Sequence, residues 1–110
     1  VQAKNCAPIV HAYKKTSTPL KVTRTIAEGV SVSTPVRGEA IISLFKQIDG
    51  KIVAVDEDVI LSSRSQLAGR GIYVEPTSAI VWAALREHYV DLPEPIILVM
   101  TGSGYKYSNQ

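Results

Sequence analysis

The chain has 110 residues, of which 45% are hydrophobic and 20% are charged, and its formal net charge is +2. These values are typical of one folded domain and exclude an intrinsically disordered chain. The lysines and arginines are spread along the sequence with few aromatic residues beside them, so no nucleic-acid partner is expected. The apolar runs are much shorter than the roughly 20 residues that cross a bilayer, so no membrane partner is expected either.

A single cysteine, Cys6, is present. It cannot form an internal disulfide, and neither histidine is linked to it in a catalytic pattern, so we interpret it as a small buried thiol. A lone thiol without a secretory leader fits a reducing, cytoplasmic setting. The chain also begins without a start methionine, and we expect it to be part of a longer polypeptide.

The first third of the chain predicts a strand end, a helix and a long loop. Residues 1–3 are typical of the end of a strand. Pro8 stands where the first turn of a helix leaves an amide unpaired, and basic residues close the stretch, so a helix is predicted over residues 8–15. Residues 16–33 are rich in Ser, Thr and β-branched residues without a clean period, which predicts a loop.

A second helix is predicted between Pro35 and Gly50. Thr34 is suited to cap it, Pro35 to occupy its first position and Gly50 to end it. Apolar residues at helical spacing predict its inward face, which consists of Ile41, Leu44, Phe45 and Ile48.

A buried strand and a third helix follow. The continuous apolar run within residues 51–56 is typical of a strand that is covered on both faces. Acidic residues at 56–58 then favour a helix start, because the positive end of the helix dipole stabilises them. Gly69 or Gly71 ends this helix. Its predicted inner face consists of Ile60, Ser63 and Leu67.

The last part predicts an extended piece, a helix and a second buried strand. Residues 72–74 are extended, and Pro76 begins a helix that is apolar nearly all round over residues 79–85, which predicts burial on most sides. The apolar run at residues 96–100 predicts a buried strand that ends in the loop TGSG. The order of elements predicts a partial layered α/β domain, a single domain over residues 1–110 with one core.

Polar residues after two of these extended segments are candidate ligand contacts. In an open α/β sheet ligands bind beyond the carboxyl ends of strands, where Thr101 stands, and Gly102 lets the backbone approach a ligand. The alternative is an ordinary turn, since such residues are common in turns. Glu75 must be paired, capped or used. Alternatively it only precedes the helix, while Thr77 and Ser78 cap free amides.

Glu28 is a further candidate, in a segment where Gly29 suggests a tight turn, and the alternative is a solvated loop carboxylate. The sequence contains no spacing typical of a metal site, no Ser/His/Asp arrangement and no phosphate loop of the GxxxxGKS type. No metal ligand and no catalytic residue is therefore predicted in this chain.

Two motifs in the second half resemble a known family. GIYVEPTSA at residues 71–79, followed after a helix by VMTGSGYK at residues 99–106, resembles the C-terminal part of threonine synthase, a pyridoxal-phosphate enzyme built like the tryptophan synthase β subunit. VQAKNCAP, TIAEGVSVSTPVRGEA and GKIVAVDEDVI agree in order, so the resemblance covers nearly the whole chain. It implies the C-terminal portion of the large domain of a fold-type II enzyme.

The resemblance implies a role for each candidate residue. Thr101 matches the hydroxyl residue that hydrogen-bonds the pyridine nitrogen of pyridoxal 5'-phosphate, and Gly102 matches the glycine that lets the loop pass close to the ring. Glu75 matches a glutamate at the wall of the cofactor pocket, and Glu28 lies in a segment that also borders it. Tyr105 departs from the family's usual leucine.

The same resemblance implies that the site is incomplete here. The family's Schiff-base lysine and the loop that holds the cofactor phosphate lie upstream, so pyridoxal phosphate is expected in the complete enzyme and not in this chain alone. The family reaction converts O-phosphohomoserine, a small amino-acid substrate, to threonine and phosphate, and the isolated chain is expected to be inactive.

Two alternatives to threonine synthase stay open. One is a threonine or serine dehydratase of the same fold. The other is a non-catalytic, self-associating domain, because an exposed sheet edge and an uncovered apolar face favour pairing. A homo-oligomer is expected.

Overall fold

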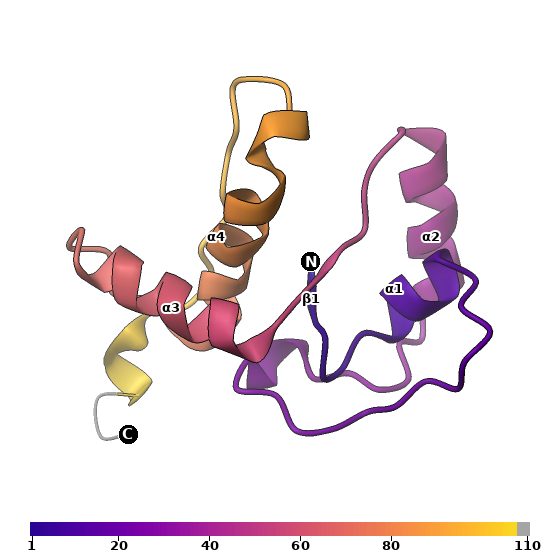
Figure 1. Cartoon of the computed structure of the whole chain (residues 1–110), viewed down its shortest axis with the longest axis horizontal. Coiled ribbons are helices and arrows are strands. Elements are labelled where there is room, and N and C mark those ends of the chain that lie inside the picture. The colour runs from indigo at the N-terminus through magenta and orange to yellow at the C-terminus, as the bar shows by residue number, and fades with distance from the viewer. Residues whose placement is uncertain (108–110) are drawn as a thin grey trace.

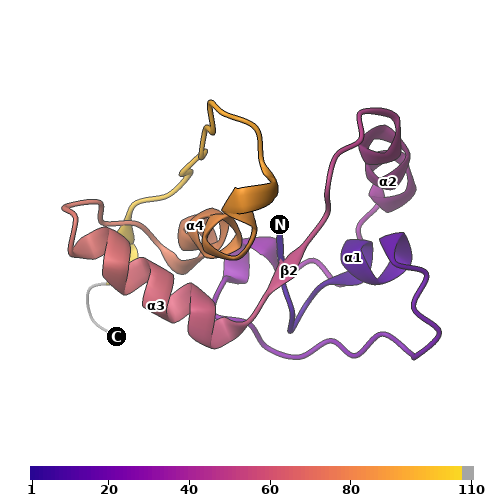
Figure 2. The same ribbon diagram turned by 45° about the horizontal axis from the view of Figure 1, so that its top comes forward.

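The computed structural model describes residues 1–107 and has helices on both sides of a small central sheet (Figure 1). Its elements are β1 (Gln2–Ala3), α1 (Pro8–Tyr13), η1 (Glu28–Val30), α2 (Gly38–Gln47), β2 (Ala54–Val55), α3 (Glu57–Ala68), α4 (Pro76–His88), η2 (Tyr89–Asp91) and η3 (Gly104–Tyr107), where η marks a short 3₁₀-helix. The helices α1 and α2 lie on one side of the strands and α3 and α4 on the other, as the rotated view of Figure 2 also shows. The architecture is the predicted layered α/β arrangement.

The two strands form a parallel pair. Gln2 lies opposite Ala54, and Ala3 lies opposite Val55. The paired part of β2 is shorter than the strand predicted within residues 51–56, because β1 offers only two residues as partners.

Buried side chains form two clusters, one on each face of the sheet, where the sequence predicted a single core. Val53 and Val55 pack on the side of α3 and α4, whereas Ile52 and Ala54 pack on the side of α1 and α2. This division follows from the alternation of side chains along an extended chain. The strand is therefore covered on both faces, as predicted.

The helices α3 and α4 pack closely against each other. The inner face of α3 is buried as predicted and consists of Ile60, Ser63 and Leu67. The prediction that α4 is buried on most sides over residues 79–85 is confirmed, because none of these residues is exposed. The half-buried side chains of this stretch are Val81, Trp82 and Leu85. Two of them, Val81 and Leu85, border an apolar groove that no described part of the chain fills.

Two helix boundaries differ from the prediction. The helix α2 starts at Gly38 and not at Pro35, because the Gly38 amide donates to the Pro35 carbonyl at 3.2 Å in a separate turn. Thr34 therefore does not cap the helix. The helix α1 ends at Tyr13, and Lys15 then takes a positive φ of 51°, which a right-handed helix does not contain.

The inward face of α2 is narrower than predicted. Ile41 and Phe45 pack on the cluster around α1, whereas Leu44 and Ile48 are exposed. Among the described elements, α1 is the main neighbour of α2. A helix that packs against one neighbour buries only the side chains that face this neighbour. Two of the four predicted inward residues therefore stay exposed.

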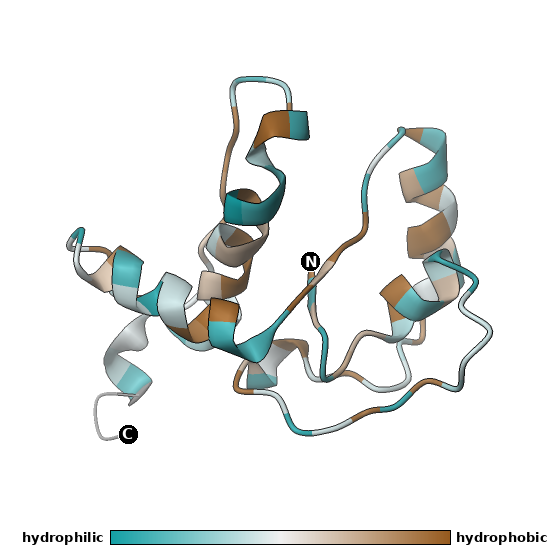
Figure 3. Cartoon of the chain, in the orientation of Figure 1, coloured by the Kyte–Doolittle hydropathy of each residue, from teal (hydrophilic) through white to brown (hydrophobic). Residues whose placement is uncertain are grey.

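Residues 96–100 do not form the predicted buried strand. They return beside α4 as an extended segment without strand pairing, one of the most hydrophobic runs of the chain (Figure 3). Ile97 is 83% exposed and Val99 68% exposed. An apolar segment forms a strand only where a neighbouring strand pairs with its backbone groups. Within residues 1–107, the sheet contains only β1 and β2, and no strand pairs with this segment.

Two expectations from composition concern Cys6 and the membrane. Cys6 is fully buried as a free thiol, as predicted. None of the helices within residues 1–107 has the length and apolar character that crossing a bilayer requires.

Gln2 caps α1 from the neighbouring strand. Its Oε1 accepts hydrogen bonds from the amides of Ile9 and Val10, both at 3.0 Å. The residue at the N-cap position, Ala7, has no side chain that could do so. The side chain of Gln2 therefore pairs amides that the start of a helix leaves unpaired.

We predict that Gln2→Ala destabilises the folded chain by about 1–3 kcal/mol, because the two amides lose their acceptor. Gln47→Ala, at an exposed position of α2, is the matched control and should change the free energy of unfolding by less than about 0.5 kcal/mol. Urea unfolding followed by circular dichroism measures both variants. Equal effects would contradict the capping role of Gln2.

Candidate functional site

Ser78, in the first turn of α4, holds the loop that follows residues 96–100. Its Oγ accepts hydrogen bonds from the amides of Thr101 at 3.1 Å and Gly102 at 2.7 Å, and it lies 3.2 Å from Thr101 Oγ1. Ser78 is only 2% exposed, whereas Thr101 is exposed. The hydroxyl of Thr101 is thus held by a buried hydroxyl, on a residue that is itself exposed.

Glu75 lies against Gly102 of the same loop. The Glu75 amide donates to the Gly102 carbonyl at 3.2 Å. A Cβ on Gly102 would come within 1.8 Å of Glu75 Oε1, so only glycine fits while the carboxylate keeps this place. The side chain of Glu75 is 15% exposed, and its Oε2 lies 3.9 Å from Lys106 Nζ. Its charge is therefore paired, at the outer limit of an ion pair.

Thr77 connects the same turn of α4 to η1. Its Oγ1 accepts a hydrogen bond from the Gly29 amide at 3.0 Å. A Cβ on Gly29 would come within 2.8 Å of the Thr77 methyl group, so the close approach requires glycine. Glu28 beside it is exposed, and its Oε1 lies 3.7 Å from Arg24 Nη2.

The alternative in which Thr77 and Ser78 cap α4 is wrong. The start of α4 has no side-chain cap, and the amides of Ser78 and Ala79 donate to the Glu75 carbonyl, both at 3.0 Å. Pro76 has no amide to cap. The two hydroxyls are therefore free to bind segments that are distant in the sequence.

Aromatic packing supports the other side of the loop. The rings of Tyr73 and Tyr105 meet edge to face with centroids 5.3 Å apart. The Arg64 guanidinium lies 5.5 Å from the centre of the Tyr73 ring, and its Nε donates to the Val74 carbonyl at 3.2 Å. Tyr105, which departs from the family's leucine, thus has an aromatic neighbour.

A polar hollow of about 560 Å³ adjoins Pro76, and Glu28 and Glu57 both line it. Glu57 Oε2 accepts a hydrogen bond from the Ile26 amide at 2.8 Å. Its other oxygen, Oε1, is buried without a hydrogen-bond partner among the described residues. The hollow is acidic at Glu28 and Glu57, but Arg24 and Arg64 also line it.

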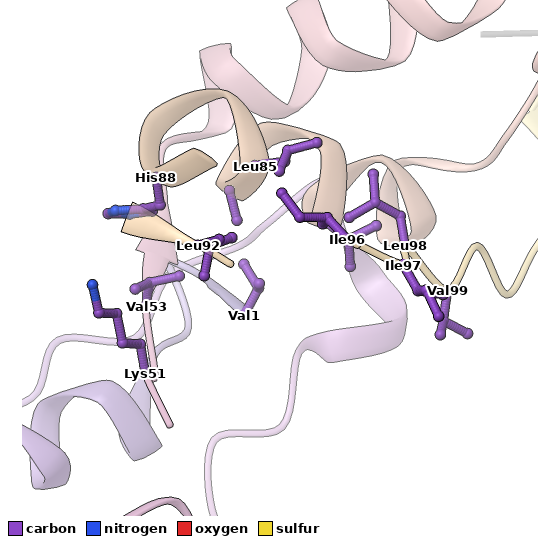
Figure 4. A pocket seen from close by; sticks show the side chains of 12 residues that line it. Val1, Lys51, Val53, Leu85, His88, Leu92, Ile96, Ile97, Leu98 and Val99 are labelled. Carbon is purple, nitrogen blue, oxygen red and sulfur yellow. The ribbon is translucent and has the colours of Figure 1, made fainter. Parts of the chain in front are cut away.

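A second hollow, the apolar groove, has a volume of about 350 Å³ (Figure 4). It is lined by parts of α4, by residues next to the two strands, by Leu92 and by residues 96–99. Its apolar lining includes Val1, Val53, Val81, Leu85, Leu92, Ile96, Ile97, Leu98 and Val99. None of the candidate site residues lines the groove. The groove is therefore separate from the loop that contains Thr101 and Gly102.

The family of the chain is decided by a match to a protein-family model. The model of the family described as "Pyridoxal-phosphate dependent enzyme" matches residues 1–102. The chain belongs to this family. Pyridoxal phosphate is therefore the cofactor of the complete enzyme.

Named relatives of this pyridoxal-phosphate enzyme chain include two threonine synthases. The chain is 32% identical to the threonine synthase of Methanocaldococcus jannaschii, over 96% of this chain and 28% of that protein. It is 32% identical to the threonine synthase of Methanosarcina acetivorans, over 93% of this chain and 27% of that protein. The chain thus spans little more than a quarter of the length of these relatives.

A solved structure confirms the fold-type II architecture. The chain is similar to the crystal structure of the T.th. threonine deaminase, with a TM-score of 0.70 and 27% identity. The match covers 92% of this chain and 37% of that structure. This chain of the pyridoxal-phosphate family therefore has the fold of part of a larger enzyme.

The structure brings three of the four predicted site residues together. Thr101, Gly102 and Glu75 form one cluster at the start of α4. Glu28 lies apart, beside the polar hollow, and is linked to the cluster only through Gly29 and Thr77. Its exposed side chain agrees with the alternative of a solvated loop carboxylate.

Two residues that organise this region were not predicted in their observed roles. Ser78 was considered only as an alternative helix cap and instead binds the loop, and Glu57 was expected to favour the start of α3 and also binds the Ile26 amide. Both contacts join residues more than twenty positions apart in the sequence. No local pattern carries such a signal.

The described residues fit one side of the cofactor. An exposed, neutral hydroxyl on Thr101 suits a ring nitrogen, which is a single hydrogen-bond acceptor. Gly102 adds no side chain beyond that hydroxyl, and the space of its absent Cβ is taken by the Glu75 carboxylate. The chain can therefore supply one wall of a cofactor site.

We predict that Gly102→Ala destabilises the folded chain by about 1–3 kcal/mol, because the new methyl group displaces the Glu75 carboxylate. The double variant Gly102→Ala/Glu75→Ala removes the collision and should recover most of that loss. Gly69→Ala is the matched control, since its Cβ would meet atoms no closer than 3.6 Å. Chemical denaturation measures all three variants. If the double variant is no more stable than the single one, the collision is not the cause.

Proposed function

We propose that this chain is the C-terminal part of the large domain of a pyridoxal-phosphate-dependent lyase that resembles threonine synthase. In the complete enzyme the reaction converts O-phosphohomoserine to threonine and phosphate. The observation that carries the proposal is the exposed hydroxyl of Thr101, held by Ser78 next to Glu75 and Gly102. The identity to two threonine synthases supports this choice of reaction.

The proposed roles follow from the chemistry of each side chain. Thr101 donates a hydrogen bond to the ring nitrogen of the cofactor, and Gly102 lets the loop pass close to the ring. Pyridoxal phosphate, when bound, supplies a ring that withdraws electrons from the substrate. The neutral Thr101 hydroxyl tempers that withdrawal, because it leaves the ring nitrogen unprotonated. Glu75 forms a wall of the pocket, and Glu28 borders it from the side of η1.

The lysine that binds the cofactor and the loop that holds its phosphate are proposed to lie outside residues 1–110. A Schiff-base lysine must be held partly neutral and aimed at the aldehyde. The side chain of Lys106 is 72% exposed, and its Nζ lies 3.9 Å from the Glu75 carboxylate. Lys106 therefore does not suit this role.

A second candidate function is that of a threonine or serine dehydratase. It is supported by the similarity to a threonine deaminase structure, with a TM-score of 0.70. The two reactions differ in their products, because a dehydratase forms an oxoacid and ammonia and releases no phosphate. The complete enzyme is proposed to act in the cytoplasm, which the free buried thiol of Cys6 supports.

We predict that the gene product that contains this sequence, purified at its natural length with pyridoxal phosphate, releases phosphate and threonine from O-phosphohomoserine. The 110-residue chain alone should release neither, because it supplies one wall of the site. A phosphate assay and amino-acid analysis measure both proteins. Formation of an oxoacid and ammonia from threonine, without turnover of O-phosphohomoserine, would select the dehydratase. Phosphate release by the 110-residue chain alone would contradict the proposed incompleteness.

We also predict that the isolated chain self-associates through the apolar groove, because two of its side chains, Ile97 and Val99, are mostly exposed to water. The double variant Ile97→Asp/Val99→Asp should be monomeric at concentrations where the unsubstituted chain is not. Val36→Asp is the control, since Val36 is 100% exposed and lies outside the groove. Analytical ultracentrifugation measures the masses. A monomeric unsubstituted chain would contradict the prediction.

A further inference from the structure

The hydroxyl of Ser78 is surrounded by three hydrogen-bonding groups of the loop. Two of them, the amides of Thr101 and Gly102, can only donate, and they lie 3.1 and 2.7 Å from Oγ. A serine hydroxyl has two acceptor sites and one proton to donate. Both acceptor sites are therefore filled, and the proton is left for the third group, Thr101 Oγ1, at 3.2 Å.

The direction of this last hydrogen bond determines what Thr101 offers to a ligand. Because Thr101 Oγ1 accepts from Ser78, its own proton is not used between the two hydroxyls and points away from Ser78. Thr101 is exposed, so that proton is available to a molecule bound against the loop. A hydroxyl that accepts one hydrogen bond also becomes a stronger donor, because hydrogen bonds in a chain polarise one another.

We propose that Ser78 is a positioning residue that makes Thr101 a hydrogen-bond donor to the unprotonated ring nitrogen of the cofactor. This inference rests on the proposed function, because it takes the ring nitrogen as the ligand atom. Ser78 is 2% exposed, so it acts only through Thr101. A buried serine that holds a loop thereby also sets the proton direction of the neighbouring hydroxyl.

The alternative is that Ser78 only holds the loop in place. The two roles differ in one respect, because an effect through the Thr101 hydroxyl disappears when that hydroxyl is removed. A purely structural effect stays, since the amides of Thr101 and Gly102 still bind Ser78 Oγ in Thr101→Val. A double-variant cycle with Ser78→Ala and Thr101→Val therefore separates the two roles.

The first measurement uses the 110-residue chain and amide hydrogen exchange. Ser78→Ala should speed exchange at Thr101 and Gly102 by about tenfold, because each amide loses its acceptor. Thr101→Val should leave the Gly102 amide protected. Ser63→Ala is the matched control, a buried helical serine of α3 that does not contact the loop and should leave both amides unchanged. Unchanged exchange in Ser78→Ala would overturn the hydrogen-bond assignment and the inference with it.

The second measurement uses the gene product at its natural length, loaded with pyridoxal phosphate labelled with ¹⁵N in the ring. The ring nitrogen should give the resonance of an unprotonated pyridine, and Ser78→Ala should move it and weaken cofactor retention about tenfold. Ser63→Ala should change neither. In the Thr101→Val background, adding Ser78→Ala should not shift the resonance further. A further shift of the same size in that background would assign Ser78 a structural role only.

Failure of this inference and failure of the proposed function give different results. If the unsubstituted natural-length protein retains no pyridoxal phosphate, the proposed function fails and the inference falls with it. If that protein retains the cofactor but Ser78→Ala leaves the ring-nitrogen resonance in place, only the inference is overturned.

Discussion

The buried hydroxyl of Ser78 is the contact on which the candidate site depends. It joins the first turn of α4 to the loop at Thr101 and Gly102, next to the isolated antiparallel bridge between Val74 and Ser103. The start of α4 can spare this hydroxyl because Pro76 has no N–H group and the amides of Ser78 and Ala79 donate to the Glu75 carbonyl. A helix start that needs no side-chain cap is therefore what lets Ser78 bind the loop.

The fold was predictable where the signal is local. Pro8 and Pro76 marked helix starts, and the period of α3 identified its buried face, because proline geometry and helical spacing act within one or two turns. The run at 96–100 was mispredicted because burial and strand pairing depend on neighbours that a local pattern does not contain. The exposure of Leu44 and Ile48 in α2 has the same cause, because one neighbouring helix buries only the side chains that face it.

The candidate site was predictable in its residues and less so in its connections. The position after an apolar run identified Thr101 and Gly102, and the position before a buried helix identified Glu75. These three residues lie together. The carboxylate of Glu75 in the Cβ position of Gly102 is a contact between residues 27 positions apart, which requires coordinates to see. The acceptor and donor sites of Ser78 also require distances, because the sequence is equally compatible with a capping serine.

The Ser78–Thr101 pair concerns the ring nitrogen of the cofactor and does not determine which reaction the complete enzyme catalyses. A threonine synthase and a threonine dehydratase of this family share the cofactor, so an unprotonated ring nitrogen would be common to both. What separates the two reactions is the recognition of the substrate phosphate, and nothing in the cluster of Thr101, Gly102 and Glu75 suits a phosphate, since Glu75 brings a like charge. We propose that this chain contributes to how the cofactor is held, and we expect the choice of substrate to depend on residues outside this cluster. The ring-nitrogen experiment tests the first contribution whichever product the complete enzyme forms.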